Sequence, residues 1–85
     1  MNNWLSYMNK KIKVYSTSNC PYCFTLKEYL KSINIVFEDI DVLKNKMAFD
    51  EMIDKSKQTG VPVIDIDGEI VIGFDKEKIN QIIKN

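Results

Sequence analysis

The chain of 85 residues contains no histidine and no arginine, and it has only two cysteines, two prolines and three glycines. Without histidine, a Cys–His nucleophile pair is impossible. Zinc normally takes four ligands, mostly Cys and His, so a structural zinc site would need two chains. The twelve lysines balance twelve carboxylates, so the positive field that nucleic-acid binding requires is missing as well. We therefore expect neither a metal site nor a nucleic-acid partner.

Long hydrophobic runs are also missing, because no apolar stretch approaches the length of a membrane span. No basic residue precedes Trp4 and Leu5, so the start of the chain does not resemble a secretory signal. These features predict a cytoplasmic protein without a membrane partner. Apolar residues make up 45% of the chain and charged residues 28%, which is typical of one small soluble domain. We expect that domain at residues 11–85, with residues 1–10 as an N-terminal extension.

The two cysteines stand three positions apart in the motif Cys20-Pro21-Tyr22-Cys23. Thiols at this spacing can close a small disulfide ring and reopen it. A structural disulfide would contribute little here, because so short a loop removes little entropy from the unfolded chain. The other interpretations are half of a metal knuckle and two incidental thiols. The lack of a second cysteine pair and of histidine favours a redox pair.

Residue periodicity predicts the element order β-α-β-α-β-β-α. Strands are expected at 11–17, 35–42, 62–66 and 69–72. Helices are expected from Pro21 to about Asn34, from Asp41 or Lys44–Asn45, and from a cap at Asp75. The segment Lys55–Gly60 is polar and loop-like, and Asp67-Gly68 is typical of a tight hairpin. The first strand, helix and strand should form a right-handed parallel unit.

Helical spacing also predicts which apolar side chains face the core. Residues interpreted as core rather than site are Phe24, Leu26, Leu30, Phe37, Met52 and Ile82. The second helix should present an apolar face of Leu43, Met47, Phe49, Met52 and Ile53.

Cys20 falls at or next to the N-cap of the first helix. Unpaired backbone N–H groups and the positive end of the helix dipole favour a thiolate there, and the thiolate is the attacking species. Cys23 lies one turn further on and should be less exposed, so we assign it the resolving role. Pro21 loses no hydrogen bond at the first helical position, and Tyr22 should cover the rim of the site.

The dipeptide Val61-Pro62 is the second informative stretch. A proline that opens a strand is usually trans and protects an edge. A cis bond would instead leave the Val61 backbone free beside the cysteines, where an extended peptide could pair with it as an added strand. From spacing alone the trans form is expected.

The cysteine motif, the preceding Lys13–Ser16, Val61-Pro62 and Ile72-Gly73-Phe74-Asp75 together resemble the glutaredoxin family over nearly the whole chain. The resemblance implies an α/β, thioredoxin-like fold, with a four-stranded mixed sheet in the order 2-1-3-4 flanked by helices. Its first two strands would be parallel and its third antiparallel to the first. The resemblance also implies a cis bond before Pro62.

The same resemblance implies a thiol–disulfide oxidoreductase that acts as an electron carrier. It would reduce protein disulfides or glutathione mixed disulfides through a reversible Cys20–Cys23 disulfide. No bound cofactor is implied, glutathione would be reductant or ligand, and we expect a monomer. Residues implied to bind glutathione or substrate are Thr17, Tyr22, Val61, Pro62, Gly73, Phe74 and Asp75.

Three positions depart from the pattern of glutaredoxins that use glutathione. Thr17 stands where a Lys or Arg is common, Gly60 separates Thr59 from Val61, and Phe74 replaces a second glycine. Gly73-Phe74 is closer to the glutaredoxin-like redoxins that serve ribonucleotide reductase and take electrons from thioredoxin reductase. The electron donor therefore stays open between glutathione and thioredoxin reductase.

Two other functions stay open as alternatives. The first is an iron–sulfur cluster or metal carrier that binds through Cys20 at a dimer interface, with glutathione. Relatives of that kind tend to carry a small residue and a serine at the positions of Pro21 and Cys23, so both residues argue against it. The second is a redox-sensing binding module.

Overall fold

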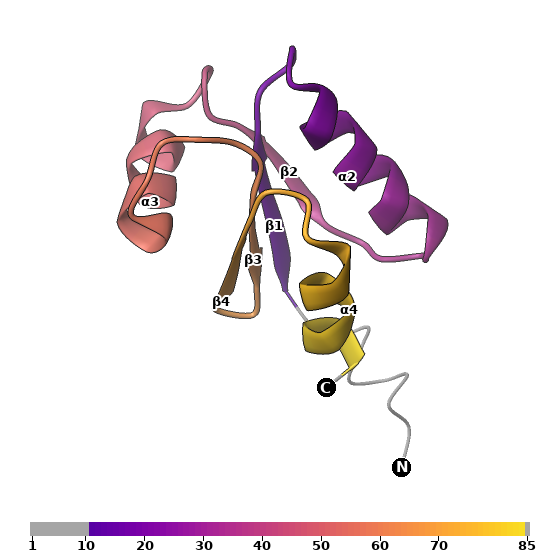
Figure 1. The fold of residues 1–85 in the computed structure, drawn as a ribbon. Coiled ribbons are helices and arrows are strands. Elements are labelled where there is room, and N and C mark those ends of the chain that lie inside the picture. Colours follow the sequence, from indigo (N-terminus) through magenta and orange to yellow (C-terminus); the bar gives the residue numbers. More distant parts are fainter. Residues whose placement is uncertain (1–10, 85) are drawn as a thin grey trace.

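The computed structural model describes residues 11–84, so the extension expected at residues 1–10 lies outside the described part. Four strands form the sheet: β1 (Ile12–Ser16), β2 (Glu38–Asp41), β3 (Val63–Ile66) and β4 (Glu69–Ile72). Three helices surround it: α2 (Pro21–Ser32), α3 (Lys46–Ser56) and α4 (Lys76–Lys84). The described chain therefore follows the expected order β-α-β-α-β-β-α (Figure 1).

The sheet has the order β2-β1-β3-β4. β1 runs parallel to β2 and antiparallel to β3, and β3 pairs antiparallel with β4. The thioredoxin-like topology is confirmed. The β3–β4 hairpin turns at Asp67 and Gly68, whose φ angles of 54° and 98° lie in the left-handed region. A two-residue hairpin turn needs positive φ at both positions, and Asp-Gly supplies this readily.

Helices cover both faces of the sheet, with α2 and α4 on one face and α3 on the other (Figure 1). On the α2–α4 face, Leu26 and Leu30 lie one turn apart and pack with the inward isoleucines of α4. The buried cluster on this face consists of Ile12, Val14, Leu26, Leu30, Ile35, Ile64, Ile66, Val71, Ile79, Ile82 and Ile83. On the α3 face the buried cluster is Tyr15, Val42, Ala48, Met52 and Val63.

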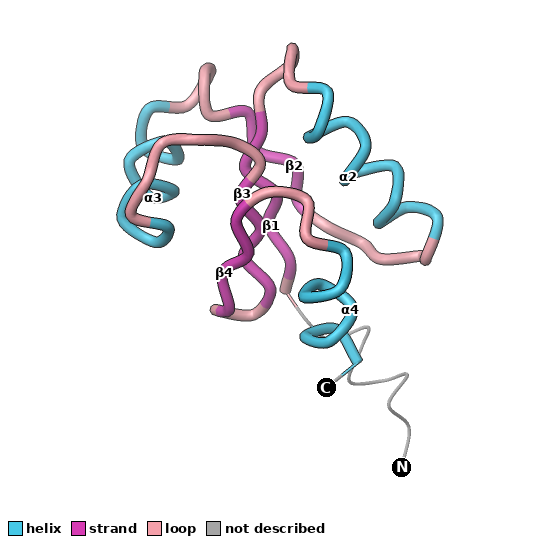
Figure 2. Tube along the Cα trace, viewed as in Figure 1, coloured by secondary structure: helices cyan, strands magenta, loops and turns pink. Residues whose placement is uncertain are grey.

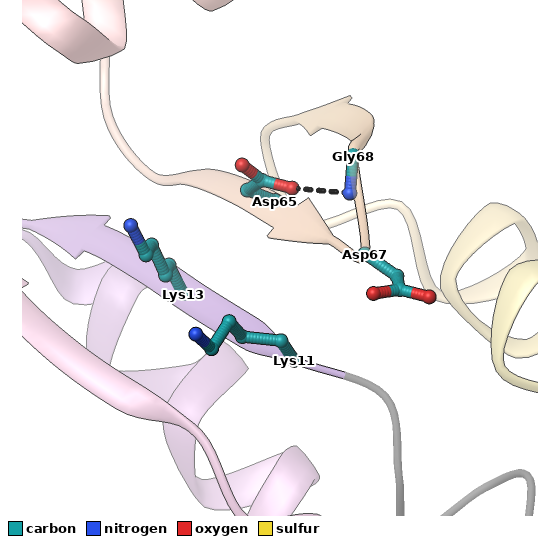
Figure 3. A pocket seen from close by; sticks show the side chains of 5 residues that line it. All are labelled: Lys11, Lys13, Asp65, Asp67 and Gly68. Atoms are coloured by element: carbon teal, nitrogen blue, oxygen red, sulfur yellow. Dashed lines mark hydrogen bonds between the residues drawn. The ribbon is translucent and has the colours of Figure 1, made fainter.

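A polar network joins α3 to the central strands. The Tyr15 side chain is fully buried; its hydroxyl donates to Glu51 and accepts from Lys55 Nζ at 2.9 Å. Lys55 Nζ also donates to Asp65 Oδ2 on β3 at 2.6 Å. Asp65 Oδ1 in turn accepts the N–H of Gly68 at 2.7 Å (Figure 3). Every buried polar atom of this network therefore has a hydrogen-bond partner.

The second strand is shorter than expected, because it begins at Glu38 and not at Ile35. Asn34 adopts a positive φ of 63°, and two hydrogen bonds close the end of α2. The Ile35 N–H donates to the Leu30 carbonyl, and the Asn34 N–H donates to the Lys31 carbonyl. This pair of bonds is the Schellman motif. Ile35 therefore completes the helix end and cannot start the strand.

The apolar face expected for α3 is only partly correct. Leu43 and Met47 are 71% and 83% exposed. Leu43 precedes the helix, which begins after an Asn45 cap that accepts the Ala48 N–H at 3.1 Å, and Met47 lies in its first turn but outside the buried set of Ala48, Met52 and Ser56. The end of α3 also differs, since the helix runs through Lys55 to Ser56, where a loop was expected.

Phe24, expected in the core, is 65% exposed. It follows Cys23 directly on α2, and successive helical residues point about 100° apart. The inward face of α2 is occupied by Cys23, Leu26 and Leu30, so Phe24 points away from it. Within residues 11–84, no helix combines the length and the apolar character needed to cross a bilayer.

Candidate functional site

Both cysteines lie where β1 passes into α2. Figure 2 shows that the loops after β1, β2 and β4 and the loop before β3 all leave the sheet at the same end. Cys20 is the N-cap of α2, with extended backbone angles of φ −108° and ψ 109°, and Pro21 is the first helical residue. The motif thus places one sulfur at a helix N-terminus, as the sequence predicted.

Cys20 is a partly exposed residue, and its sulfur has two neighbours on the backbone. The Cys23 N–H donates to Cys20 Sγ at 3.2 Å. Across the site, the Cys20 thiol lies 4.0 Å from the carbonyl oxygen of Val61. The Cys20 sulfur therefore faces a helical N–H on one side and the Val61 carbonyl on the other.

Cys23 is fully buried. Burial is the largest cause that raises the pKa of the Cys23 thiol to about 11, and the hydrogen bond with Cys20 adds to it. A backbone hydrogen bond from Thr17 and the charge of Lys27 lower this pKa, but by less. Cys23 is therefore a thiol at neutral pH, held close to Cys20 and away from solvent.

Below the cysteines, a polar cluster joins α2 to β1 and β2. Lys27 Nζ lies 3.0 Å from Asp39 Oδ2 and 3.5 Å from Ser16 Oγ. The Ser16 hydroxyl, which is buried, donates to Asp39 Oδ1 at 3.0 Å. Neither Ser16 nor Asp39 was predicted as a site residue from the sequence. The available signal was that both belong to neighbouring parallel strands, β1 and β2, beside the helix that carries Lys27.

The Val61–Pro62 bond is cis, so the bond form that spacing alone predicted is wrong and the form implied by the family resemblance is confirmed. Pro62 is buried, and its carbonyl accepts the Gly73 N–H at 2.8 Å. The structure therefore brings Val61, Pro62 and Gly73 together with Cys20 at one end of the sheet.

The other residues expected to contact glutathione are more dispersed. Thr17 is partly exposed, and Tyr22 is 70% exposed at the helix start. The Phe74 ring packs on Tyr29 of α2 with 5.7 Å between ring centroids. Asp75 is exposed, and its Oδ1 caps α4 by accepting the Lys78 N–H at 3.1 Å. The Phe74 and Asp75 side chains thus help to form the start of α4.

A separate hollow lies at the opposite end of β1, lined by Lys11, Lys13, Asp65, Asp67 and Gly68 (Figure 3). Its charges are of both signs. Within residues 11–84, no three Cys, Asp or Glu side chains converge in a way that could hold a metal ion. The cysteine end of the sheet is therefore the candidate site of the chain.

Comparison with known proteins agrees with this site. The glutaredoxin family model matches residues 12–71. A glutaredoxin-like 8.6 kDa protein of the rubredoxin operon of Clostridium pasteurianum, itself uncharacterized, is 52% identical over 73 residues, which are 86% of this chain and 97% of that protein. Glutaredoxin 3 of Escherichia coli is 34% identical over 64 residues, or 75% of this chain and 77% of that protein.

Among solved structures, the glutaredoxin-like NrdH-redoxin from Escherichia coli superposes with a TM-score of 0.74 over 84% of this chain and 92% of that chain. At 24% identity this likeness shows the fold alone. The family model, by contrast, spans the strand, the cysteine motif and the cis-proline segment together. The chain belongs to the glutaredoxin family of thiol–disulfide oxidoreductases, with Cys20 and Cys23 as its Cys-x-x-Cys pair.

Proposed function

We propose that the chain reduces disulfides of proteins, or mixed disulfides with glutathione, in two exchange steps. In the first step, the Cys20 thiolate attacks one sulfur of the substrate disulfide. A Cys20–substrate bond forms, the substrate disulfide breaks, and the other substrate sulfur leaves as a thiolate that takes up a proton. The partly exposed Cys20 sulfur with its N–H donor at 3.2 Å supports this role.

In the second step, Cys23 loses its proton and attacks Cys20 Sγ. The Cys20–Cys23 disulfide forms and the second substrate thiolate leaves, so two electrons pass from the protein to the substrate. The observation that carries the assignment is the contrast between the two cysteines, since Cys20 is a partly exposed residue and Cys23 is fully buried. A high pKa keeps Cys23 from competing for the substrate in the first step.

Val61 is proposed to hold the substrate backbone. It is half-buried beside Cys20, and within residues 11–84 its N–H has no hydrogen-bond acceptor. An extended substrate segment could pair with that N–H as an added strand, which would bring its sulfur to Cys20. The same segment would be bordered by Thr17, Tyr22, Pro62 and Gly73.

The electron donor is proposed to be glutathione or a thioredoxin reductase. Glutathione carries two carboxylates, and the loop Thr17–Asn19 before Cys20 contains no cation to bind one. We therefore propose a direct comparison of turnover with glutathione plus glutathione reductase against turnover with thioredoxin reductase. Activity with only one of the two systems assigns the donor.

The two-step route is tested with single cysteine variants and a peptide that carries a mixed disulfide with thionitrobenzoate. The wild-type dithiol should release the coloured thiol and then the free peptide. Cys20→Ser should release neither, and Cys23→Ser should release the coloured thiol but stay linked to the peptide, which mass spectrometry detects. Equal loss of the first step in both variants would contradict the assigned roles. A brown, dimeric protein purified without oxygen would instead indicate a cluster carrier.

A further inference from the structure

In the connection between α3 and β3, the side chain of Gln58 forms hydrogen bonds with the backbone two residues further along the chain. Both the oxygen and the nitrogen of the Gln58 amide bond to one residue, Gly60. The Gly60 N–H donates to Gln58 Oε1 at 2.8 Å, and Gln58 Nε2 donates to the Gly60 carbonyl at 3.1 Å. A residue in an antiparallel sheet likewise forms two hydrogen bonds with one partner, one through its N–H and one through its carbonyl.

The Gln58 amide is itself attached to the end of α3. Gln58 Nε2 lies 3.2 Å from the oxygen of Ser56, a buried residue whose hydroxyl donates to the Met52 carbonyl at 2.7 Å. Met52 is fully buried in the cluster on the α3 face of the sheet. A continuous set of hydrogen bonds therefore runs from the core, through Ser56 and Gln58, to the backbone of Gly60.

Gly60 precedes Val61, whose carbonyl lies 4.0 Å from the Cys20 sulfur. On the other side of Val61, the Pro62 carbonyl is held by the Gly73 N–H at 2.8 Å. Val61 is thus flanked by two fixed backbone groups, one held by Gln58 and one by Gly73. Losing the Gln58 contact would free the segment on one side only, and Val61 would no longer be placed accurately beside Cys20.

The contact with Gln58 also explains why position 60 is a glycine. Gly68 and Gly73 adopt positive φ angles, but Gly60 does not, so its backbone does not by itself require glycine. A Cβ atom at position 60 would instead lie 2.9 Å from Gln58 Oε1. Any side chain there would push the Gln58 amide away from its two bonds. Gly60 separates Thr59 from Val61 in this chain. Its lack of a side chain therefore leaves the space that the Gln58 amide occupies.

We propose that Gln58 is a positioning residue for disulfide exchange: its side-chain amide holds Gly60, and through it the Val61 edge on which the substrate segment docks beside Cys20. The inference rests on the proposed docking role of Val61. If the contact between Gln58 and Gly60 served stability alone, its loss would lower the free energy of unfolding without changing how substrate binds. We expect its loss instead to raise the substrate concentration needed for half-saturation.

The test is a single-turnover reaction of the reduced full-length protein with the peptide–thionitrobenzoate disulfide. Gln58→Ala should raise the half-saturating peptide concentration about tenfold, because the two hydrogen bonds from the Gln58 amide no longer fix the docking edge. The maximal rate should change by less than about twofold, since Cys20 and its N–H donor are untouched. The matched control is Gln81→Ala, at the chain's other glutamine, which is exposed on α4 and should leave both values unchanged.

Gly60→Ala gives an independent variant, because it displaces the amide while leaving Gln58 in place. It should raise the half-saturating concentration as Gln58→Ala does, and the double variant should be no worse than either single one. Additive effects, or an unchanged half-saturation in Gln58→Ala, would overturn the inference while leaving the proposed function intact. If the wild-type protein released no coloured thiol, that result would instead contradict the proposed function itself.

Discussion

The ammonium of Lys27, one helical turn beyond Cys23, lies 3.0 Å from the carboxylate of Asp39. The charge of Lys27 lowers the pKa of Cys23, whereas burial, the largest influence, raises it. Asp39 faces Lys27 on one side and Ser16 on the other. Because Asp39 pairs with Lys27, we expect its negative charge to offset part of the effect of the lysine charge on Cys23.

The first prediction concerns the two members of this pair. Lys27→Met should slow the release of peptide from the mixed disulfide by about threefold to tenfold, because a nearby positive charge that favours the Cys23 thiolate is removed. Asp39→Asn should accelerate the same step, because the lysine charge is no longer offset. Quenched-flow measurement of the Cys20–peptide intermediate gives both rates. A change in the same direction in both variants would contradict the electrostatic explanation.

The second prediction concerns the ionisation of Cys23. In Cys20→Ser, the rate at which iodoacetamide alkylates Cys23 should keep rising with pH beyond the pKa of about 8.5 expected for a free thiol. Burial persists in this variant, and it is the largest cause of the raised pKa of about 11. The same variant unfolded in guanidinium provides the control. An inflection at or below the control value would show that Cys23 is not desolvated as described.

The third prediction compares a half-buried ion pair with an exposed one. Lys55→Met should lower the free energy of unfolding by about 2 kcal/mol, because Asp65 and the Tyr15 hydroxyl lose their charged partner. Lys46→Met removes an exposed pair with Asp50 on the same helix, and it should change stability by less than about 0.5 kcal/mol. Urea unfolding at neutral pH measures both. Equal effects would mean that the pair with Asp65 contributes no more than a surface pair.

The fourth prediction is a loss of stability in acid through Asp65. Burial opposes ionisation of this carboxyl, but the hydrogen bonds from Lys55 and Gly68 and the charge of Lys55 outweigh it, so its pKa is lowered. A carboxyl with a lowered folded-state pKa stabilises the fold above its unfolded value of about 3.9, and this stabilisation is lost as the pH falls through the folded value.

Asp65→Asn should therefore be less stable than wild type at pH 7, and its stability should fall less steeply between about pH 5 and pH 2. Asp54→Asn is the control, since Asp54 is exposed on α3. Urea midpoints over this pH range provide the measurement. An acid dependence as steep as that of wild type would show that the Asp65 pKa is not lowered.

The fifth prediction separates two roles of Asp75. Asp75→Ala should lower stability by about 1 kcal/mol, because the Lys78 N–H loses its cap, whereas Asp75→Asn keeps an oxygen for that cap and should be nearly neutral. If Asp75 also contacts glutathione, both variants should reduce glutathione mixed disulfides less efficiently. Thermal unfolding and turnover measured side by side distinguish the roles. Full activity in Asp75→Asn would limit Asp75 to capping.

Features whose causes lie within a few residues of chain were predictable from sequence. Pro21 at the helix start, the Asp67-Gly68 turn and the Asp75 cap each depend on backbone groups within about one turn. The bounds of β4 were also predicted correctly, because this strand directly follows that turn. The placement of Cys20 follows from the same local chemistry, since a strand, a proline and a helix leave its sulfur at the N-cap.

Features that depend on tertiary contacts were not predictable in this way. The contact of Asp39 with Lys27 forms only when α2 packs against β2, so nothing close to Asp39 in the sequence predicts it. The double contact between Gln58 and Gly60 needs an end of α3 that the sequence assigned to a loop. Phe24 is a different case, because a stricter count of helical phase from Cys23 would have placed it outside the core.

The two borders of the sheet differ in chemistry. β2 carries Glu38, Asp39 and Asp41 in four residues, whereas β4 presents Ile70 and Ile72 with a single carboxylate, Glu69. Closely spaced negative charges repel a second strand of the same kind, whereas a border with one charge at its start opposes pairing less. Self-association of the folded protein by strand addition would therefore proceed through β4, and a lysine introduced at Ile72 would be the natural means of suppressing it at high concentration.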